Sequence, residues 1–502
     1  MNTPPEDETI LSFQRFIAIK TALIKGNELA IATSWEHLLG QLRQEVQKVS
    51  DKGLSVFPII NYDDLSSPGK TLTFLADLRT RGSAIIRNVV PKDEAETWTS
   101  ELDQYLQHNS HATVSQSDNV ELHGLFWSPA QIKARAHPNM LAVQKFLMGQ
   151  SWKTGDHYNQ NSRVSVDHPL TYADRIRVVT QDGSCEFSPS TLNSVRSARV
   201  DGGGIERWDS DGYGGRMKGG TYEKIWSGNM EAYDPWDSST RLDITTNLYD
   251  CESACTSFRM FQGLLALDST SHPQMEICAL PLKLATSYWL LRPFFSPKSP
   301  VGGKTDAFLS SANWVLNTNQ NPDLHGAQPG HFQEINTILH PHLQLDKTLV
   351  PLPQLNAGDL VVWHPDTIYA QTKTSHPSAC SSCSSSPTAL SETITKLLDM
   401  PICPLTLTNA HFLYSQRKAF ILGLPGPDYN NAPHLCDNDV GISGEGTYLG
   451  RPGVQEVYNA GGEAALRAMG LLAWDVDKMT IHEEAERRLI KMANDVLFPD
   501  QI

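Results

Sequence analysis

The first clear pattern in the chain is a helical repeat of apolar positions between residues 10 and 49. Apolar side chains recur there at intervals of three and four residues, which places them on one face of a helix. They are Phe13, Phe16, Ile17, Ile19 and Leu23, followed by Trp35, Leu38, Leu39, Leu42 and Val46. We therefore expect two amphipathic helices. A strand over residues 84–90 and a helix over residues 92–106 should follow, because Pro91 suits a first helical turn.

Between residues 172 and 370 the pattern changes to short β-branched and aromatic runs. Gly, Pro, Asp and Asn separate these runs, which is typical of strands joined by turns. Strands are predicted over residues 175–180, 241–246, 257–267 and 360–363. This alternation of short strands and turn residues favours a β-sandwich or a barrel-like core.

The region after residue 373 mixes a loop with further helices. Residues 374–387 are rich in Ser, Cys and Pro without any period, and predict an exposed loop. Cys380 and Cys383 have the spacing of a zinc or redox pair, but no second pair or His follows at a matching distance. We interpret them as part of an inert surface loop. A short helix near residues 390–398 and helices over residues 461–470 and 480–497 are also expected.

Composition and charge narrow the class of protein. A chain of 502 residues with 40% hydrophobic and 19% charged residues is typical of one large enzyme-sized unit or two tightly joined ones. The formal net charge of −15 opposes binding to nucleic acid or to anionic lipid. The apolar runs are much shorter than the ~20 residues that a membrane span requires. The polar, acidic start lacks the pattern of a secretory signal, so we expect a cytoplasmic protein without membrane or nucleic-acid partners.

One candidate for chemistry is a short segment that ends in three glycines. Arg199 and Asp201 are two residues apart and share one face if the segment is a strand. Gly202, Gly203 and Gly204 then allow the chain to turn sharply. A structural Arg–Asp pair is by itself the commoner use of such residues, so the spacing alone does not assign them a function.

Two further candidates lie in apolar strands. His364, Asp366 and Tyr369 follow the strand predicted over residues 360–363, although a single His at such a place is usually structural. Arg259 interrupts an otherwise apolar run, where a buried guanidinium needs an anionic partner. A structural salt bridge and a carboxylate-binding role both remain open for Arg259.

Several motifs together resemble a bacterial and fungal family catalogued as a domain of unknown function. The resemblance extends, with gaps, from Phe16 to Asn494. The motifs are residues 172–177, 200–208, 225–228, 233–237, 258–263, 291–295, 340–343, 358–364 and 416–420. That family looks like the non-haem iron, 2-oxoglutarate-dependent dioxygenases. The resemblance implies a double-stranded β-helix, a cupin-like jelly roll, wrapped by N- and C-terminal helices.

The resemblance also implies an iron site, from which this sequence departs. Such oxygenases hold Fe(II) with a His-X-Asp pair and a distal His. Asp201 matches the carboxylate ligand, whereas Arg199 and Tyr369 stand at the two histidine positions. Arginine cannot lend a lone pair to a metal, and a tyrosine phenolate favours Fe(III). We therefore expect no metal and no cofactor, with Fe(II) and 2-oxoglutarate as the alternative.

By this resemblance, the former metal pocket becomes a substrate pocket for a small molecule. Arg199, Asp201 and Tyr369 are the expected catalytic residues. The expected substrate-binding residues are His364, Trp208, Trp226, Tyr233, Arg259, Gln262 and Arg417. Of these, Arg259 and Arg417 are the alternatives for holding a carboxylate.

The domain organisation follows the same resemblance. We expect a mainly helical support region over residues 1–165 and a β-helix core over residues 166–373 and 401–460. The insertion and its short helix occupy residues 374–400, and C-terminal helices occupy residues 461–502.

Three hypotheses about function remain. The first is a small-molecule enzyme of secondary metabolism that catalyses a redox-neutral, metal-independent cyclisation, pericyclic reaction, dehydration or isomerisation. The second is an Fe(II)- and 2-oxoglutarate-dependent oxygenase with an irregular ligand set, such as Asp201 with His364 or with another histidine. The third is a non-catalytic protein that binds a ligand in the same pocket.

Overall fold

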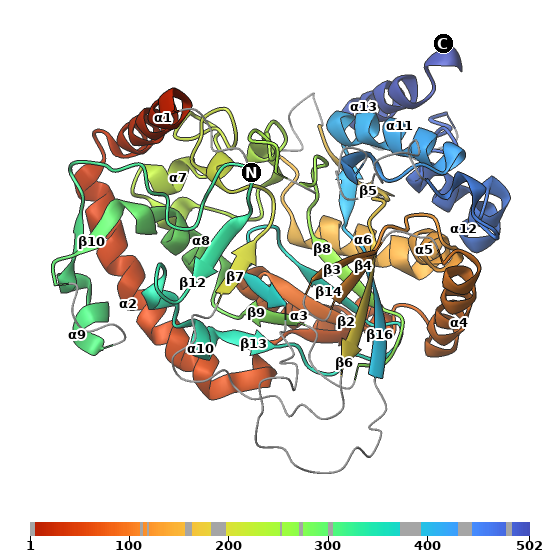
Figure 1. Ribbon diagram of the computed structural model, residues 1–502, viewed down its shortest axis with the longest axis horizontal. Coiled ribbons are helices and arrows are strands. Elements are labelled where there is room, and N and C mark those ends of the chain that lie inside the picture. The colour runs from red at the N-terminus through yellow and green to blue at the C-terminus, as the bar shows by residue number, and fades with distance from the viewer. Residues whose placement is uncertain are drawn as a thin grey trace.

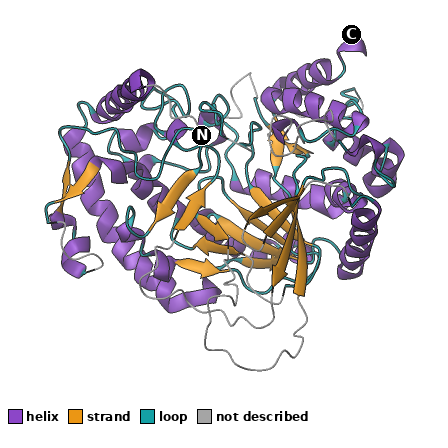
Figure 2. Cartoon of the chain, viewed as in Figure 1, coloured by secondary structure: helices purple, strands orange, loops and turns teal. Residues whose placement is uncertain are grey.

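The computed structural model describes residues 6–110, 114–117, 120–155, 163–181, 197–251, 254–270, 275–299, 305–371, 393–429, 444–477 and 484–501. Figures 1 and 2 show strands at the centre of the molecule with helices on both sides. This mixed architecture with several sheets confirms the expected α+β class. The predicted loop with Cys380 and Cys383 lies outside the described residues.

Two sheets form the centre of the fold. The larger has the order β1 (Ile59–Asn61), β2 (Ser83–Arg87), β14 (Leu360–Trp363), β8 (Gln262–Ala266), β16 (Thr393–Asp399), β6 (Ile176–Gln181), β4 (Val120–His123) and β3 (Val114–Ser117). The smaller has the order β12 (Gln333–Asn336), β7 (Ser197–Val200), β15 (Tyr369–Gln371), β9 (Met275–Cys278) and β13 (Leu349–Pro351). Two-stranded sheets pair β5 (Ser165–Leu170) with β17 (Cys403–Leu405), and β10 (Phe295–Pro297) with β11 (Trp314–Leu316).

Strands β8 and β14 of the larger sheet bury both of their faces. Successive side chains of a strand point to opposite faces, so neighbouring residues enter different cores. Leu264 of β8 packs in a cluster that also contains Ile277 of the smaller sheet. The next residue, Leu265, packs in a second cluster with Trp98 and Leu147, which lie on helices. The two sheets therefore face each other across one core, and helices cover the outer face of the larger sheet.

The N-terminal helices confirm the apolar periodicity of the first fifty residues. The two expected helices are α1 (Glu6–Ile24) and α2 (Glu28–Lys52). Trp35 of α2 stacks on Phe295, with 4.3 Å between the ring centroids, and on Tyr288 of α8 (Leu282–Leu291). The helices that follow in this part of the chain are α3 (Pro68–Arg81), α4 (Lys92–His108), α5 (Pro129–Ala136) and α6 (Pro138–Ser151).

The C-terminal helices lie at the opposite end of the molecule from α2 (Figure 1). They are α11 (Leu407–Leu422), α12 (Val454–Ala468) and α13 (Glu484–Leu497), so both helices predicted after residue 460 exist. Their apolar residues pack with Phe126 and Trp127 in a third cluster. The short helices are α7 (Glu223–Trp226), α9 (Asp306–Leu309) and α10 (Leu345–Thr348). The proposed domain boundaries stay predictions.

Two of the predicted elements are wrong. The helix expected over residues 390–398 is instead strand β16, which pairs on one side with β6 and on the other with β8. A short apolar run suits a helix or a buried strand equally. Here the residues form a strand because they pair with strands on both sides. The strand expected over residues 241–246 does not form, because Arg241 enters a buried ion pair with Asp366 and the Thr245 amide bonds to a loop carbonyl.

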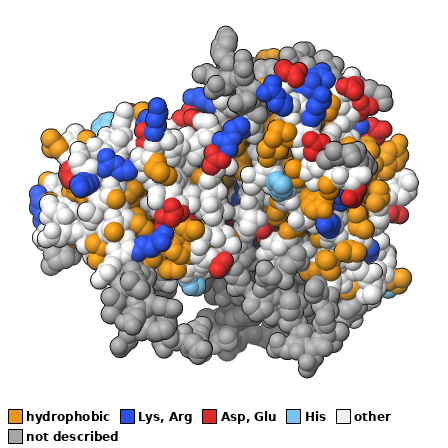
Figure 3. All heavy atoms as spheres, turned by 90° about the horizontal axis from the view of Figure 1, so that it is seen from above, with side chains coloured by type: hydrophobic (Ala, Val, Ile, Leu, Met, Phe, Trp, Pro, Cys, Tyr) orange, Lys and Arg blue, Asp and Glu red, His pale blue; other side chains and the backbone are white. Residues whose placement is uncertain are grey.

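One face of the molecule carries mixed charges. In the view of Figure 3, Lys and Arg side chains alternate with Asp and Glu side chains, so neither sign dominates that face among the residues drawn in colour. None of the helices in the described ranges is both long enough and apolar enough to span a membrane.

Candidate active site

Two neighbouring strands of the smaller sheet bring the candidate catalytic residues together. Tyr369, the first residue of β15, pairs directly with Arg199 of β7. Asp201 follows the last residue of β7 and precedes Gly202, whose φ of 88° turns the chain away from the sheet. Cross-strand pairing thus places Tyr369 beside two residues that lie about 170 positions earlier.

The side chains at this point form a hydrogen-bonded group, which we call the Asp201 cluster (Arg199, Asp201, Gln262 and Tyr369). The Tyr369 hydroxyl donates to Asp201 Oδ2 at 2.6 Å, and Arg199 Nε donates to the Tyr369 oxygen at 2.9 Å. Arg199 Nε also lies 3.4 Å from Asp201 Oδ1. Gln262 Nε2 donates to Asp201 Oδ2 at 3.2 Å. The carboxylate is therefore held from several sides by neighbouring protein groups.

Burial and charge set the protonation states of the Asp201 cluster. Tyr369 is 1% exposed, and burial raises its pKa far above that of a free tyrosine, despite the opposing effect of Arg199. The Tyr369 oxygen and the Asp201 carboxylate raise the pKa of Arg199. At neutral pH the cluster thus contains a neutral phenol and a fixed positive charge. The Arg199 side chain is 36% exposed, so its terminal nitrogens can reach a ligand.

A second, fully buried group is called the Asp366 cluster (Arg207, Tyr222, Tyr233, Arg241 and Asp366). Sequence reasoning named Asp366 and Tyr233 as candidates but missed the group that they form. Asp366 Oδ1 lies 2.6 Å from Arg207 Nη1, and its Oδ2 lies 2.5 Å from Arg241 Nη2. The hydroxyls of Tyr222 and Tyr233 also donate to this carboxylate. The two arginines hold the pKa of Asp366 well below its usual range against the effect of burial. No local motif signals this group, because its members are up to 159 residues apart.

Arg207 joins the two clusters. While Nη1 contacts Asp366 and Tyr222, Nη2 donates to the backbone carbonyl of Asp201 at 2.5 Å. The Arg207 side chain is completely buried, so its position is fixed by these partners. The Asp366 cluster thereby holds the backbone that presents the Asp201 carboxylate.

His364 occupies a structural place next to the Asp366 cluster. Its Nε2 donates to the Pro235 carbonyl at 3.0 Å, and its Nδ1 accepts from the Asp366 amide at 3.0 Å. The ring stacks on Trp152 with 5.0 Å between centroids. Burial lowers the pKa of His364 to about 3, so the ring is neutral. The structure does not bring it to the Asp201 carboxylate, because both ring nitrogens are engaged elsewhere.

The other sequence-predicted residues divide between the site and the rest of the fold. Gln262 belongs to the Asp201 cluster, as described, and Tyr233 belongs to the Asp366 cluster. Trp208 donates from its indole nitrogen to the Leu290 carbonyl and is fully buried. Trp226 is also fully buried and packs near Phe294. Both indoles therefore contribute to the apolar core.

The two carboxylate-binding candidates lie in different places. Arg417, on α11, donates to the Leu497 carbonyl and stacks on Phe498, 4.5 Å from the ring centroid. It therefore joins α11 to the end of α13 and is not part of the Asp201 cluster. Arg259 lines a small cavity together with Gly202, the residue that follows Asp201. Only Arg259 lies beside the candidate site.

The donor set around Asp201 does not fit an Fe(II) ion of the oxygenase type. One carboxylate oxygen accepts hydrogen bonds from Tyr369 and Gln262, and the other faces the Arg199 guanidinium. A permanently charged arginine cannot act as a ligand and repels a cation. Across the described ranges, no three His, Cys, Asp or Glu side chains form a group that could hold a metal ion.

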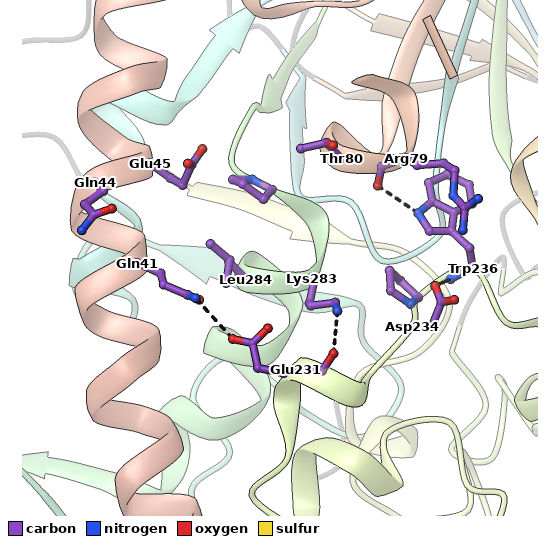
Figure 4. Close-up of a pocket in the computed structure, with 12 residues that line it drawn as sticks. Gln41, Gln44, Glu45, Arg79, Thr80, Glu231, Asp234, Trp236, Lys283 and Leu284 are labelled. Atoms are coloured by element: carbon purple, nitrogen blue, oxygen red, sulfur yellow. Dashed lines mark hydrogen bonds between the residues drawn. The ribbon is translucent and has the colours of Figure 1, made fainter. Parts of the chain in front are cut away.

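A larger groove lies between α2, the end of α3 and the start of α8 (Figure 4). It has a volume of about 520 Å³. Gln41 Nε2 donates to Glu231 Oε1 at 3.2 Å, and Lys283 Nζ donates to the Glu231 carbonyl at 2.9 Å across it. None of the sequence-predicted site residues lines this groove, and its Glu231 carboxylate is already paired. We therefore place the candidate site at the Asp201 cluster.

The buried histidines predict a stability that falls in acid. Burial lowers the pKa of His342 and of His364 to about 3, below the ordinary value near 6.5. The unfolded chain therefore takes up protons between about pH 6.5 and 3 that the folded chain refuses. We expect the thermal midpoint to fall as the pH is lowered through this window, and to fall less steeply in His342→Gln.

The control for this titration is His37→Gln, because His37 is exposed and its imidazole is 60% accessible. Its midpoint should follow the wild-type curve against pH. A His342→Gln curve parallel to wild type between pH 7 and 4 would contradict the expectation.

Comparison with known proteins supports the architecture. The chain is similar to the crystal structure of the GlcNAc Inducible Gene 2 protein of Candida albicans, with a TM-score of 0.77 and 24% sequence identity. The superposed region covers 99% of this chain and 97% of that chain. Protein YbiU of Escherichia coli (strain K12) is 28% identical over 339 residues, which is 65% of this chain and 71% of YbiU. The epimerase SnoN, solved with Fe³⁺ and alpha ketoglutarate, has a TM-score of only 0.28 at 9% identity, over 68% of this chain and 85% of that chain.

The sequence motifs quoted above all fall inside one family match. The profile of the Gig2-like family matches residues 11–471, which is most of the chain, so this protein belongs to the Gig2-like family.

Proposed function

We propose that this protein is a small-molecule enzyme that performs redox-neutral acid–base catalysis at the Asp201 cluster, without metal or other cofactor. Cyclisation, dehydration and isomerisation are reactions of this class. The observation that carries the proposal is the preformed contact of Tyr369 with Asp201 and Arg199, at 2.6 and 2.9 Å. A carboxylate, a phenol and a guanidinium at hydrogen-bonding distance can move a proton and stabilise an oxyanion.

We infer that the scaffold is a double-stranded β-helix. One half would consist of β6, β16, β8 and β14, and the other of β7, β15, β9 and β13, in the orders given above. In support, a small cavity lies between the two sheets and is lined by Arg177, Trp363 and Tyr369. Val179, Leu264, Met275, Gln371 and Leu397 complete its lining.

Each member of the Asp201 cluster has a distinct task in this mechanism. Asp201 accepts the proton, since its Oδ1 is a buried atom without a hydrogen bond to any described residue. Tyr369 orients the carboxylate through Oδ2. Arg199 turns its terminal nitrogens toward the substrate, since only its Nε is used by Tyr369. These nitrogens stabilise the negative charge that proton removal leaves on the substrate.

The iron oxygenase alternative requires a different ligand set. His364 would have to leave the Pro235 carbonyl and Asp366 amide to reach a metal near Asp201. The four cysteines within the described ranges are all buried, and buried thiols suit a reducing cytoplasm. We propose the cytoplasm as the location and a small organic molecule as the partner.

The direct test is a search for turnover. Purified protein is incubated under nitrogen, with a chelator, in a small-molecule extract, and products are compared by mass spectrometry with those of Asp201→Asn. We expect a substrate that disappears and a product of equal mass, or of mass lower by one water, only with the wild type. A binding protein would retain a compound without converting it, and conversion only with added iron and oxygen would overturn the proposal.

Iron binding by a double variant gives a second prediction. Replacing the two residues at the former ligand positions, as Arg199→His with Tyr369→His, creates a His-X-Asp pair with a second His opposite it. We expect this double variant to bind about one Fe(II) per chain in an anaerobic titration, whereas the wild type binds none above background. Stoichiometric Fe(II) binding by the wild type would contradict the assignment of Asp201 as a base.

A further inference from the structure

A second small cavity is lined in part by Gly202, the residue that follows Asp201. It has a volume of about 40 Å³. Its lining contains two arginines, five hydroxyl-bearing residues and no Asp or Glu. The lining residues are Gly202, Tyr213, Arg241, Leu242, Ile244, Thr246, Cys255, Thr256, Ser257, Phe258, Arg259, Pro365 and Thr408. Such a lining suits an anionic group.

Arg259 is the lining residue whose positive charge forms no ion pair within the described ranges. Arg241 is bound to Asp366, whereas Arg259 has neither a hydrogen bond nor an ion pair with any residue in the described ranges. Burial disfavours its charge, yet nearby Cys255 and Asp201 raise the pKa of Arg259 above its ordinary value. Arg259 is partly exposed, so its guanidinium can be reached by a ligand anion that enters the cavity.

Ser257 provides an independent sign of a missing partner. The residue is 5% exposed, and its hydroxyl has no hydrogen bond to any group that the structure describes. It stands two positions before Arg259, and both residues line the same cavity. Buried hydroxyls normally have partners, and an acceptor in the cavity would supply one.

We propose that this cavity binds a carboxylate group of the substrate, held by Arg259 and Ser257. The inference rests on the proposed function for its use, because an anchored acid group beside Gly202 would fix the substrate against the Asp201 carboxylate. A guanidinium forms paired hydrogen bonds with a planar carboxylate. A single water needs about 10–15 Å³ by this measure of volume, so the cavity has room for a small group such as a carboxylate.

Binding of small probes tests this subsite without knowledge of the substrate. Acetate, inorganic phosphate and neutral acetamide are titrated into the full-length protein, with ligand-observed NMR as the readout. We expect acetate to bind the wild type, acetamide not to bind, and phosphate to bind more weakly than acetate. Arg259→Gln should weaken acetate binding about tenfold or more, because a charge-assisted pair is lost. Ser257→Ala should weaken it less.

Two control variants separate the loss of the site from the loss of charge or fold. Arg43→Gln removes one positive charge from an exposed pair with Asp306 and should bind acetate as the wild type does. Arg259→Lys keeps the charge and should restore part of the affinity. Equal acetate binding by wild type and Arg259→Gln, equal binding of acetamide, or preference for phosphate would each overturn the carboxylate subsite.

The subsite and the proposed function can fail separately. Asp201→Asn removes the base but leaves Arg259 and Ser257 in place, so it should bind acetate at least as well as the wild type. Acetate binding without any turnover would overturn the proposed function and leave the subsite standing. Turnover that survives Arg259→Gln with an unchanged KM would overturn the subsite and leave the function standing.

Discussion

Asp366→Asn should destabilise the folded protein by about 3–5 kcal/mol, the largest effect that we expect from one substitution. The two side chains are nearly the same size, so the change removes charge and leaves the shape. Arg207 and Arg241 are 0% and 3% exposed and would lose the carboxylate that balances them. The measurement is the free energy of unfolding from guanidinium titration of both proteins.

The matched control is Asp306→Asn. Asp306 also pairs with an arginine, Arg43, but the two side chains are 87% and 70% exposed. Exposed pairs contribute little, so this variant should unfold within about 1 kcal/mol of the wild type. If Asp366→Asn fell within the same limit, the Asp366 cluster would not be the electrostatic centre that the distances indicate.

Asp201→Asn should lower the turnover rate by about 10²–10⁴, because an amide cannot accept the proton that the mechanism requires. The amide can still accept the Tyr369 hydrogen bond through its oxygen, so the thermal midpoint should change little. Tyr369→Phe should lower the rate less, since it only releases the carboxylate from its orienting partner. The measurement is the initial rate with the substrate found in the turnover search.

Glu334→Gln is the control for this rate comparison. Glu334 lies on β12, directly opposite Arg199 on the other side from Tyr369, and its side chain is exposed. It is therefore a carboxylate near the site that takes no part in the Asp201 cluster, and its variant should keep the wild-type rate within about twofold. A rate loss in Glu334→Gln as large as that in Asp201→Asn would show that general charge, and not the position of Asp201, governs turnover.

The parts of the fold that were predictable have a strong local pattern. Helix α2 follows the spacing of Trp35, Leu38 and Leu42, and β14 matches its predicted bounds because four apolar residues follow a Gly-Asp turn. Strand β16 was mistaken for a helix because its apolar residues suit either structure. Only the position between β6 and β8, whose residues come from elsewhere in the chain, makes it a strand.

The candidate site was predictable only in part for the same reason. Arg199 and Asp201 are close in sequence, and the family resemblance supplied Tyr369 as their partner. The resemblance could not show that Trp208 and Trp226 point into the core, because a motif records residue types and not the direction of side chains. Asp366 lies two residues after His364, but its partners Arg207 and Arg241 come from distant parts of the chain, so the sequence does not show the ion pair.

The contact of Arg207 with both clusters has a consequence for how this sequence can change over time. A substitution at Asp366 frees the Arg207 guanidinium, which alters the backbone at Asp201 as well. The effects of substitutions in the two clusters should therefore not add, and their order of appearance matters. In evolutionary terms the link is epistatic. Lineages that rebuild the chemistry at Asp201 would keep the buried ion pair unchanged, and those that lose Asp366 would lose Arg207 and Arg241 with it.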